Sequence, residues 1–265
     1  MLEFRKLAAE DGIEVLDVAC THARGRGETS EHADRHAVVF VRRGCFSRVA
    51  DGEEALLDPT VAYCVNPGEE QRYDHPHSHG DDCTAVFLPP ELVAELEGAG
   101  GRLPSGPLPV PPAADLEHRL LLGSADRHEI VERALALASG AVEGATRRRP
   151  RARRPCAARA HRALADGARE ALAADAGTSL GELAARLAVS PHHLSRVFRS
   201  QTGETLSRHR MRLRTRAALD RLAGGERNLA RLAADVGFAD QSHLCRVVRG
   251  ETGRTPAALR AALAA

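Results

Sequence analysis

The chain has 265 residues, and its formal net charge of +1 hides a strong asymmetry between its two halves. Residues 1–145 carry 13 basic against 26 acidic side chains, whereas residues 146–265 carry 24 arginines against 10 acidic residues. A chain of this length can fold as two domains, and only its basic half is suited to binding polyphosphate. No stretch approaches the ~20 apolar residues of a membrane span, so we expect a cytoplasmic protein without a membrane partner.

Short apolar runs separated by turn residues occupy the chain from Ile13 to about Leu88. Asp51-Gly52 and Asn66-Pro67-Gly68 supply turns, because glycine permits positive φ and proline presets a turn position. Three of the runs predict buried strands, at 37–41, 61–65 and 84–88. Many short strands with turns about every ten residues predict a small β-barrel or sandwich, which we assign to residues 1–97.

Residues 98–145 are predicted to be a linker followed by a helical segment. The stretch 98–112 is rich in glycine and proline and is predicted to form no regular element. From Leu116 to Val142, apolar residues recur at helical spacing and predict two helices broken near Gly123. Two roles remain open for these helices, a dimer surface or a cover over the open face of the barrel.

An arginine- and proline-rich linker is predicted at residues 146–156. It holds six arginines within the eight residues 147–154. A solvated tether and a non-specific contact to DNA phosphates are both compatible with this composition. The six cysteines of the chain include no C-x-x-C pair, so neither a zinc ribbon nor a disulfide framework is indicated.

Residues 157–265 are predicted to be nearly all helical, and two stretches within them repeat each other. The second, 229–253, follows the first, 180–203, at an offset of 49 residues before an internal turn and 50 after it. Each stretch predicts a helix–turn–helix, the motif that places its second helix in the major groove of DNA. A helix of about 18 residues, Leu206 to Ala223, separates them and would be roughly 27 Å long.

Helix-start residues stand at the expected places in both repeats. Ser179 and Glu182 have the spacing of a capping box, and Ser190-Pro191 can begin the second helix of the first repeat. In the second repeat Asn228 and Asp240 are the expected caps, and Gly237 stands where a left-handed residue ends the first helix.

The segment from about His161 to Arg260 resembles the DNA-binding domain of the AraC/XylS family of bacterial transcription regulators. The most specific part of the resemblance is Gly237-Phe-Ala-Asp-Gln-Ser-His-Leu-x-Arg246 with Thr252-Gly253-x-Thr255-Pro256. The sequence departs from the family pattern at Leu206, His209 and Leu259, which are packing positions. The resemblance and the outward faces of the two second helices together give these DNA-contact candidates: His192, Ser195, Arg196, Arg199, Gln241, Ser242, Cys245, Arg246 and Arg249. Of these, Arg196 and Arg246 are the best candidates for a bidentate contact to guanine.

The same resemblance implies a cupin-like barrel in the N-terminal half, acting as an effector or dimerisation domain. The candidate effector or metal ligands are His32, His36, His75, His77, His79 and Cys83, to which the run 75–83 adds Asp81 and Asp82. A surface loop with incidental histidines, an effector or metal site, and a metal-dependent oxygenase remain as alternatives. Imidazole and thiol ligands suit zinc, iron, nickel or copper, and no cofactor is certain. The spacing His32-x-x-x-His36 differs from the H-x-H of catalytic cupins.

These patterns predict an α+β multidomain protein, with an N-terminal cupin-like β-barrel plus helices and a C-terminal all-α double helix–turn–helix. The predicted function is a sequence-specific transcription regulator that binds double-stranded DNA and responds to a small-molecule or metal effector. RNA polymerase, if the protein is an activator, and a second copy of the chain are further predicted partners. The alternatives are a cupin metalloenzyme with an appended helical domain and a non-specific architectural DNA binder. The chain has no phosphate loop, H-E-x-x-H or nucleophile–base motif, so we do not expect an enzyme.

Overall fold

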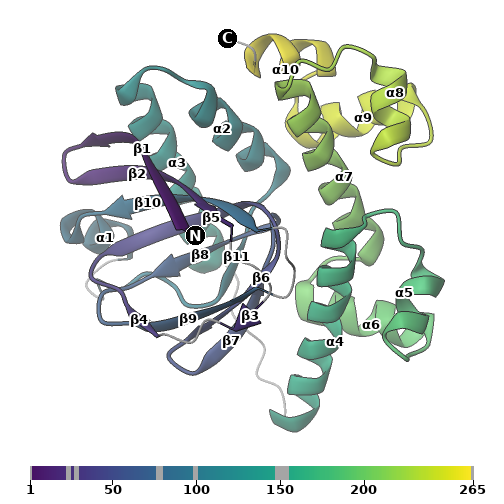
Figure 1. Cartoon of the computed structure of the whole chain (residues 1–265), viewed down its shortest axis with the longest axis horizontal. Helices are drawn as coiled ribbons and strands as arrows, with labels where there is room; N and C mark the ends of the chain where they lie inside the picture. Colours follow the sequence, from purple (N-terminus) through teal and green to yellow (C-terminus); the bar gives the residue numbers. More distant parts are fainter. Residues whose placement is uncertain are drawn as a thin grey trace. The chain divides into compact units, whose positions relative to one another are not determined.

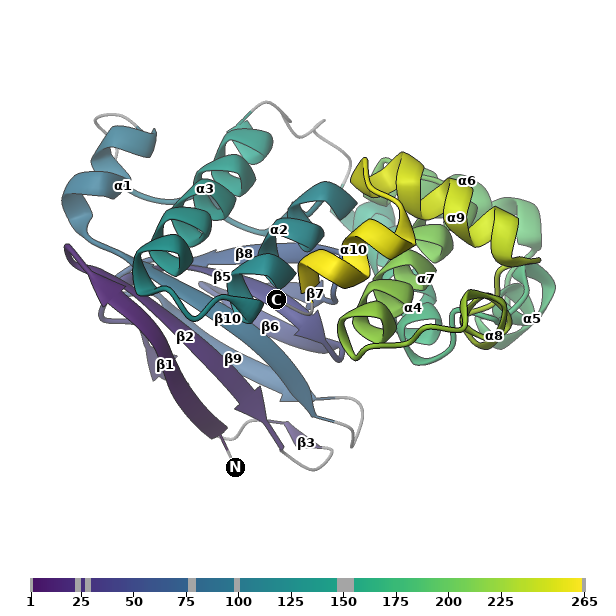
Figure 2. The same cartoon turned by 90° about the horizontal axis from the view of Figure 1, so that it is seen from above.

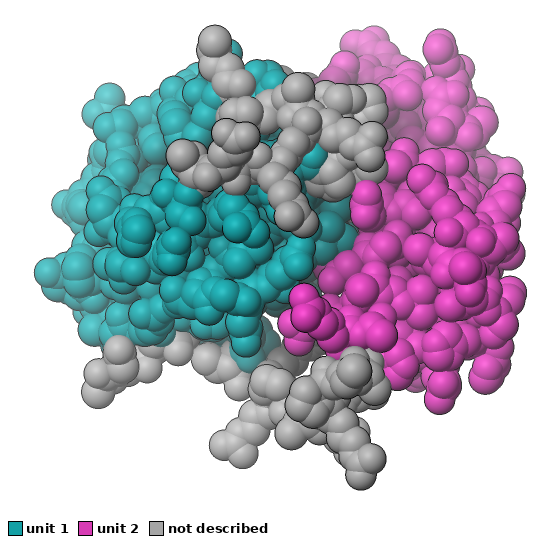
Figure 3. All heavy atoms as spheres, turned by 60° about the horizontal axis from the view of Figure 1, so that its bottom comes forward, with its two compact units in different colours: residues 1–149 teal, residues 150–265 magenta. Residues whose placement is uncertain are grey.

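A computed structural model of the chain describes residues 2–21, 25–26, 30–75, 80–97, 101–146 and 155–263. It divides the chain into two compact units, Met1–Arg149 and Pro150–Ala265, which Figure 3 shows in different colours. The division falls inside 146–156, the segment predicted as a linker, whose residues 147–154 lie outside the described part. Among the described helices, none is both long and apolar enough to cross a membrane.

Two antiparallel sheets form the framework of the N-terminal unit (Figure 1). The six-stranded sheet has the order β1 (Leu2–Glu10), β2 (Ile13–Cys20), β10 (Asp81–Leu88), β5 (His36–Arg43), β8 (Val61–Val65) and β11 (Pro107–Pro109). The other has the order β3 (Gly25–Arg26), β9 (Glu70–His75), β6 (Phe46–Ala50) and β7 (Glu53–Leu57), with β4 (Glu31–His32) also paired to β9. The three predicted strands are confirmed as β5, β8 and β10. Strand β1 was not predicted, because most of its side chains are exposed and give no buried alternation.

Strand β5 is buried on both faces, which explains its uninterrupted apolar sequence. Its residues Val39 and Val41 belong to a core between the two sheets, together with Phe46 and Tyr63. The alternate residues, such as Val38, belong to a second core on the outer face of the six-stranded sheet. Helices α1 (Pro90–Glu97), α2 (Pro112–Gly123) and α3 (Arg127–Thr146) cover that outer face, as Figure 2 shows.

The helices α2 and α3 therefore act as the cover over the sheet, one of the two roles left open by the sequence. Ile130, Ala134 and Leu137 of α3 are all buried in the core that it shares with the sheet. The predicted break near Gly123 is confirmed, since α2 ends at that residue.

The prediction that residues 98–112 form no regular element is wrong. Residues 107–109 form the edge strand β11, which pairs with β8. An edge strand tolerates proline because alternate N–H groups point away from the neighbouring strand. The side chain of Asn66 also anchors the preceding stretch: it donates to the carbonyl of Leu103 at 3.2 Å and accepts from its N–H at 2.8 Å. Residues 101–110 are thus part of the N-terminal unit rather than a free linker.

The C-terminal unit is all-helical in its described residues and contains two helix–turn–helix motifs, α5–α6 and α8–α9, joined by α7. Its helices are α4 (Pro155–Ala174), α5 (Leu180–Arg186), α6 (Pro191–Thr202), α7 (Leu206–Ala223), α8 (Leu229–Asp235), α9 (Gln241–Thr252) and α10 (Pro256–Leu263). The capping box of Ser179 and Glu182 is present, with hydrogen bonds of 2.8 and 3.2 Å. Asn228 and Asp240 cap α8 and α9 as predicted, at 2.9 and 2.7 Å. Both units together confirm the predicted fold class.

A buried ion-pair cluster holds the start of α7 against the first motif. Glu204 accepts from Nδ1 of His209 at 2.9 Å and from Arg212 at 2.8 Å, and the ring of His209 packs edge-on against Phe198. Burial alone would raise the pKa of Glu204, but the hydrogen bond from His209 and the charge of Arg212 outweigh it and lower that pKa. The resembling family carries an aromatic residue at the position of His209. The imidazole ring of His209 packs at this place as an aromatic ring does, and it also forms a hydrogen bond with Glu204.

The turns inside the two motifs use the same backbone geometry with different residues. Gly237 has φ +82°, and the N–H of Phe238 donates to Ala233 at 2.8 Å. Ala188 occupies the matching place of the first motif with φ +54°. A left-handed alanine costs about 1–2 kcal/mol that glycine does not. The first motif therefore carries backbone strain that the second avoids.

We expect Ala188→Gly to stabilise the C-terminal unit by about 0.5–1 kcal/mol, because the relieved strain exceeds the added entropy of the unfolded chain. Gly237→Ala should destabilise it by at least about 1 kcal/mol, since its Cβ would also lie 3.1 Å from the guanidinium of Arg214. Denaturant unfolding of the full chain, followed by helical circular dichroism, measures both changes. Destabilisation by Ala188→Gly would contradict this account of the turn.

Candidate nucleic-acid interface

The second helix of each motif buries one face and exposes the other. In α6, Leu194, Val197 and Phe198 are at most 2% exposed. In α9, Leu244 and Val248 are fully buried. Both helices begin at a side-chain cap and end at a glycine with positive φ, Gly203 and Gly253, so their rotation and length are well defined.

The predicted DNA contacts lie on the exposed faces of these helices. At about 100° per residue, the predicted α6 set falls within an arc of roughly 100°, and so do Ser242, Cys245, Arg246 and Arg249 of α9. His192, Arg196 and Arg199 of α6 are exposed, and Ser195 is half-buried. Gln241, Ser242, Arg246 and Arg249 of α9 are exposed, and Cys245 is half-buried. The structure thus brings together the α6 set and four of the five α9 candidates on one side of their helices, whereas Gln241 is exposed at the start of α9 outside that arc.

The arginines on these faces are available to a ligand. Within the part of the chain that the structure describes, Arg196, Arg199, Arg246 and Arg249 form no ion pair with a carboxylate. The only side-chain contact of Arg196 in this part of the chain is with Nδ1 of His193, at 3.3 Å. By contrast, buried Arg212 is paired with Glu204. Unpaired guanidinium groups at matching positions are what recognition of phosphate and guanine requires.

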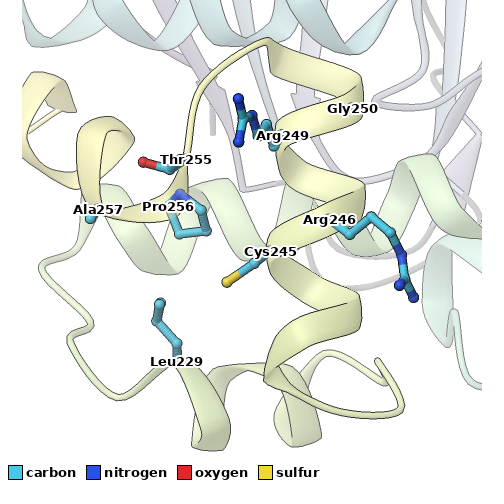
Figure 4. Close-up of a pocket in the computed structure, with 8 residues that line it drawn as sticks. All are labelled: Leu229, Cys245, Arg246, Arg249, Gly250, Thr255, Pro256 and Ala257. Atoms are coloured by element: carbon cyan, nitrogen blue, oxygen red, sulfur yellow. The ribbon is translucent and has the colours of Figure 1, made fainter.

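Cys245 differs from its arginine neighbours in the direction of its side chain. Figure 4 shows its thiol directed into a pocket lined by Leu229 and Pro256, while Arg246 extends from the other side of α9. Cys245 therefore lies at the apolar margin of the exposed face.

Among the residues that the structure describes, the histidines predicted as N-terminal ligands, His32, His36 and His75, do not come together. His32 is exposed and pairs in register with Glu70 of β9. Glu70 and His75 are five residues apart on β9, which corresponds to about 17 Å along the strand. His36 pairs with Leu88 of β10. Leu88 and Asp81 are seven residues apart on β10, which corresponds to about 23 Å along the strand. A site combining His32 and His36 with His75 is therefore not formed, because the strand register places them at opposite strand ends. His77 and His79 lie outside the described residues.

A group that includes Cys20, which the sequence did not single out, forms around His75. Its Nε2 lies 2.8 Å from a carboxylate oxygen of Asp81 and 3.6 Å from Sγ of Cys20. Cys83, a predicted ligand, is joined to this group through Asp81. Its thiol donates a hydrogen bond to the other carboxylate oxygen of Asp81, at 3.7 Å. Cys20 could be found only from the register, since Cys20 is the direct partner of Asp81 across β2 and β10.

Polar side chains also fill part of the space between the two sheets. Buried Arg48 is paired with Glu69 and donates to Oε1 of Gln71 at 3.1 Å, which also accepts from the hydroxyl of Tyr73 at 2.9 Å. Burial raises the pKa of the neighbouring Tyr63 well above its ordinary value, so its phenol is uncharged at neutral pH. The interior of the barrel thus offers both apolar and hydrogen-bonding groups.

Comparison with known proteins supports the assignment of the C-terminal unit. A family model described as a helix–turn–helix domain matches residues 183–262. The HTH-type transcriptional regulator Rv1931c of Mycobacterium tuberculosis is 34% identical over 110 residues, which cover 42% of this chain and 39% of that protein. The chain therefore matches well under half of the length of this curated relative.

The solved structures that match the chain are distant from it. ToxT of Vibrio cholerae, with a bound unsaturated fatty acid, is 10% identical, with a TM-score of 0.39 and coverage of 96% of this chain and 97% of ToxT. An AraC-type regulator from Chromobacterium violaceum is 22% identical, with a TM-score of 0.37 and coverage of 40% of this chain and 96% of that one. TM-scores below 0.5 do not by themselves establish a shared fold. The family match and the two capped motifs agree that the C-terminal unit contains a helix–turn–helix domain.

Proposed function

We propose that the chain is a transcription regulator that reads a specific sequence in double-stranded DNA through α6 and α9. The observation that carries the proposal is the pair of matching exposed faces, with arginines at equivalent positions of two motifs in one compact unit that form no ion pair with any carboxylate of the described residues. Each face can present two guanidinium groups to phosphates or base edges. A cupin metalloenzyme would have no use for this duplicated basic surface.

The length of α7 supports binding by both motifs at once. Its 18 residues make it about 27 Å long, close to the ~34 Å between successive major-groove turns on one side of B-DNA. Arg210 and Arg214 of α7 donate to the carbonyls of Thr178 and Ala176, at 2.6 and 3.2 Å, and so fix the loop that precedes α5. The first motif is thereby attached to the helix that leads to the second.

Selection of bound sequences from a random DNA pool by the full chain, near physiological salt, tests sequence-specific binding. We expect enrichment of one motif with two half-elements about one helical turn apart. Without any enrichment, and with binding that disappears as salt rises, the protein would be a non-specific DNA binder and the proposal would fail.

Arg246→Ala should weaken binding to the selected site by about 1–3 kcal/mol and relax specificity at one base pair, with a matching effect of Arg196→Ala in the other half-element. Arg246→Lys is the matched control, because it keeps the charge and loses the bidentate geometry. It should bind random DNA like the parent protein and still lose specificity. Equal losses on random and selected DNA for Arg246→Ala would assign this residue to phosphate contact alone.

We further infer that a ligand of the N-terminal unit controls DNA binding. The acidic N-terminal half, the polar and apolar interior of the barrel and the arginine-rich segment between the halves support this inference. A regulator of this kind that activates would have RNA polymerase as a further partner, and a second copy of the chain would let four motifs share one operator. A coupling of about 1–3 kcal/mol would change operator affinity roughly 5- to 150-fold.

Comparison of the full chain with residues 150–265 tests this control. We expect the two proteins to differ at least about fivefold in affinity for the selected operator, at the same salt concentration. Circular dichroism of the shorter protein serves as the control for folding. Equal affinity and equal promoter output from both proteins would show that the N-terminal unit does not control DNA binding.

A further inference from the structure

Three potential metal ligands from three different strands meet at one end of the N-terminal barrel. Cys20 ends β2, His75 ends β9 and Asp81 begins β10. Cys20 and Asp81 are 5% and 6% exposed, and the side chain of His75 is 14% exposed. The approach of the strands depends on Gly80, where a Cβ would lie 2.2 Å from the carbonyl oxygen of Cys20. The site is therefore built by tertiary structure and nearly closed to solvent.

The distances within the group are close to those of a tetrahedral metal site. A thiolate at about 2.3 Å and an imidazole nitrogen at about 2.0 Å from zinc would lie roughly 3.5 Å apart in tetrahedral geometry. Sγ of Cys20 and Nε2 of His75 are 3.6 Å apart. All three ligand atoms lie within 4.8 Å of one another, and the contact between His75 and Asp81, now 2.8 Å, needs to open by only about half an ångström.

Neighbouring side chains hold two of the ligands in place. The ring of Phe46 stacks on His75, with centroids 5.8 Å apart and an angle of 30° between the planes. This arrangement leaves Nε2 facing Asp81 and Cys20. The thiol of Cys83 donates to the second oxygen of Asp81 and leaves the first for the site. Such outer contacts orient ligands and typically contribute 10- to 100-fold to metal affinity.

We propose that Cys20, His75 and Asp81 bind a thiophilic divalent metal ion of the zinc class. One sulfur, one nitrogen and one oxygen ligand suit zinc and disfavour magnesium and calcium, which take oxygen ligands. On binding, Cys20 releases its thiol proton to water and binds as thiolate, while His75 binds through Nε2. Three protein ligands leave the fourth position for water or a small ligand. The proposal names a ligand class for the N-terminal unit, and metal binding itself does not depend on the proposed regulation of DNA binding.

Titration of the metal-free full chain with Co²⁺ tests the site directly. We expect one equivalent to produce a near-ultraviolet thiolate-to-cobalt absorption band, which Zn²⁺ then abolishes by displacement. Cys20→Ser should lose this band, and His75→Gln and Asp81→Asn should bind Co²⁺ at least about tenfold more weakly. Cys64→Ser is the matched control, since Cys64 is buried in the core on the other face of the six-stranded sheet.

A second measurement on the unmodified protein keeps the test valid if a variant fails to fold. X-ray absorption of the zinc-loaded full chain should show one sulfur neighbour at about 2.3 Å and nitrogen or oxygen neighbours at about 2.0 Å. No sulfur neighbour, two or more sulfur neighbours, or a cobalt band that persists in folded Cys20→Ser would overturn the proposal. The group would then be a structural hydrogen-bonded cluster. Because none of these readouts uses DNA, such a failure would leave the proposed regulator function untouched.

Discussion

The helical period couples core packing to the proposed recognition of DNA in this protein. Once Leu194 and Phe198 of α6 are buried, a period of 3.6 residues leaves Arg196 and Arg199 on the solvent side. The same relation holds for Leu244, Val248 and Arg246 in α9. The orientation of Arg196, Arg199 and Arg246 therefore follows from apolar burial on the opposite face. The helix caps, the central helix α7 and the buried Glu204 cluster all serve to keep that orientation fixed.

The sequence was most informative where structure depends on nearby residues. The caps at Ser179, Asn228 and Asp240, the strand β5 and the break at Gly123 each follow from patterns a few residues long, and all are present. The exposed faces of α6 and α9 were predictable for the same reason. The path of residues 98–112 was not, because the Asn66 amide that anchors Leu103 is 37 residues away in the chain.

The candidate ligands of the N-terminal unit could not be predicted in this way, because they depend on residues far apart in the chain. His75 and Cys83 were selected for their residue type, but their partners depend on which strands pair and in what register. Cys20 is 55 residues from His75, and no local pattern connects the two. His36 pairs with β10, the strand that begins at Asp81, but at the end of β10 that is far from Asp81. Only the register of β5 against β10 shows this. The sequence thus indicated His75 and Asp81 as candidate ligands and could not indicate that Cys20 lies beside them.

The double burial of the six-stranded sheet has a mechanical consequence. Val38 and Val39 are consecutive residues, yet one packs against the helices and the other faces the barrel interior. A single layer of backbone therefore separates whatever occupies the barrel from α3. A close-packed interior transmits displacement rather than absorbing it, and α3 ends at Thr146, next to the segment that joins the two units. A shift of one side chain in the barrel would thus act on α3, the N-terminal helix nearest in sequence to the half that is proposed to bind DNA.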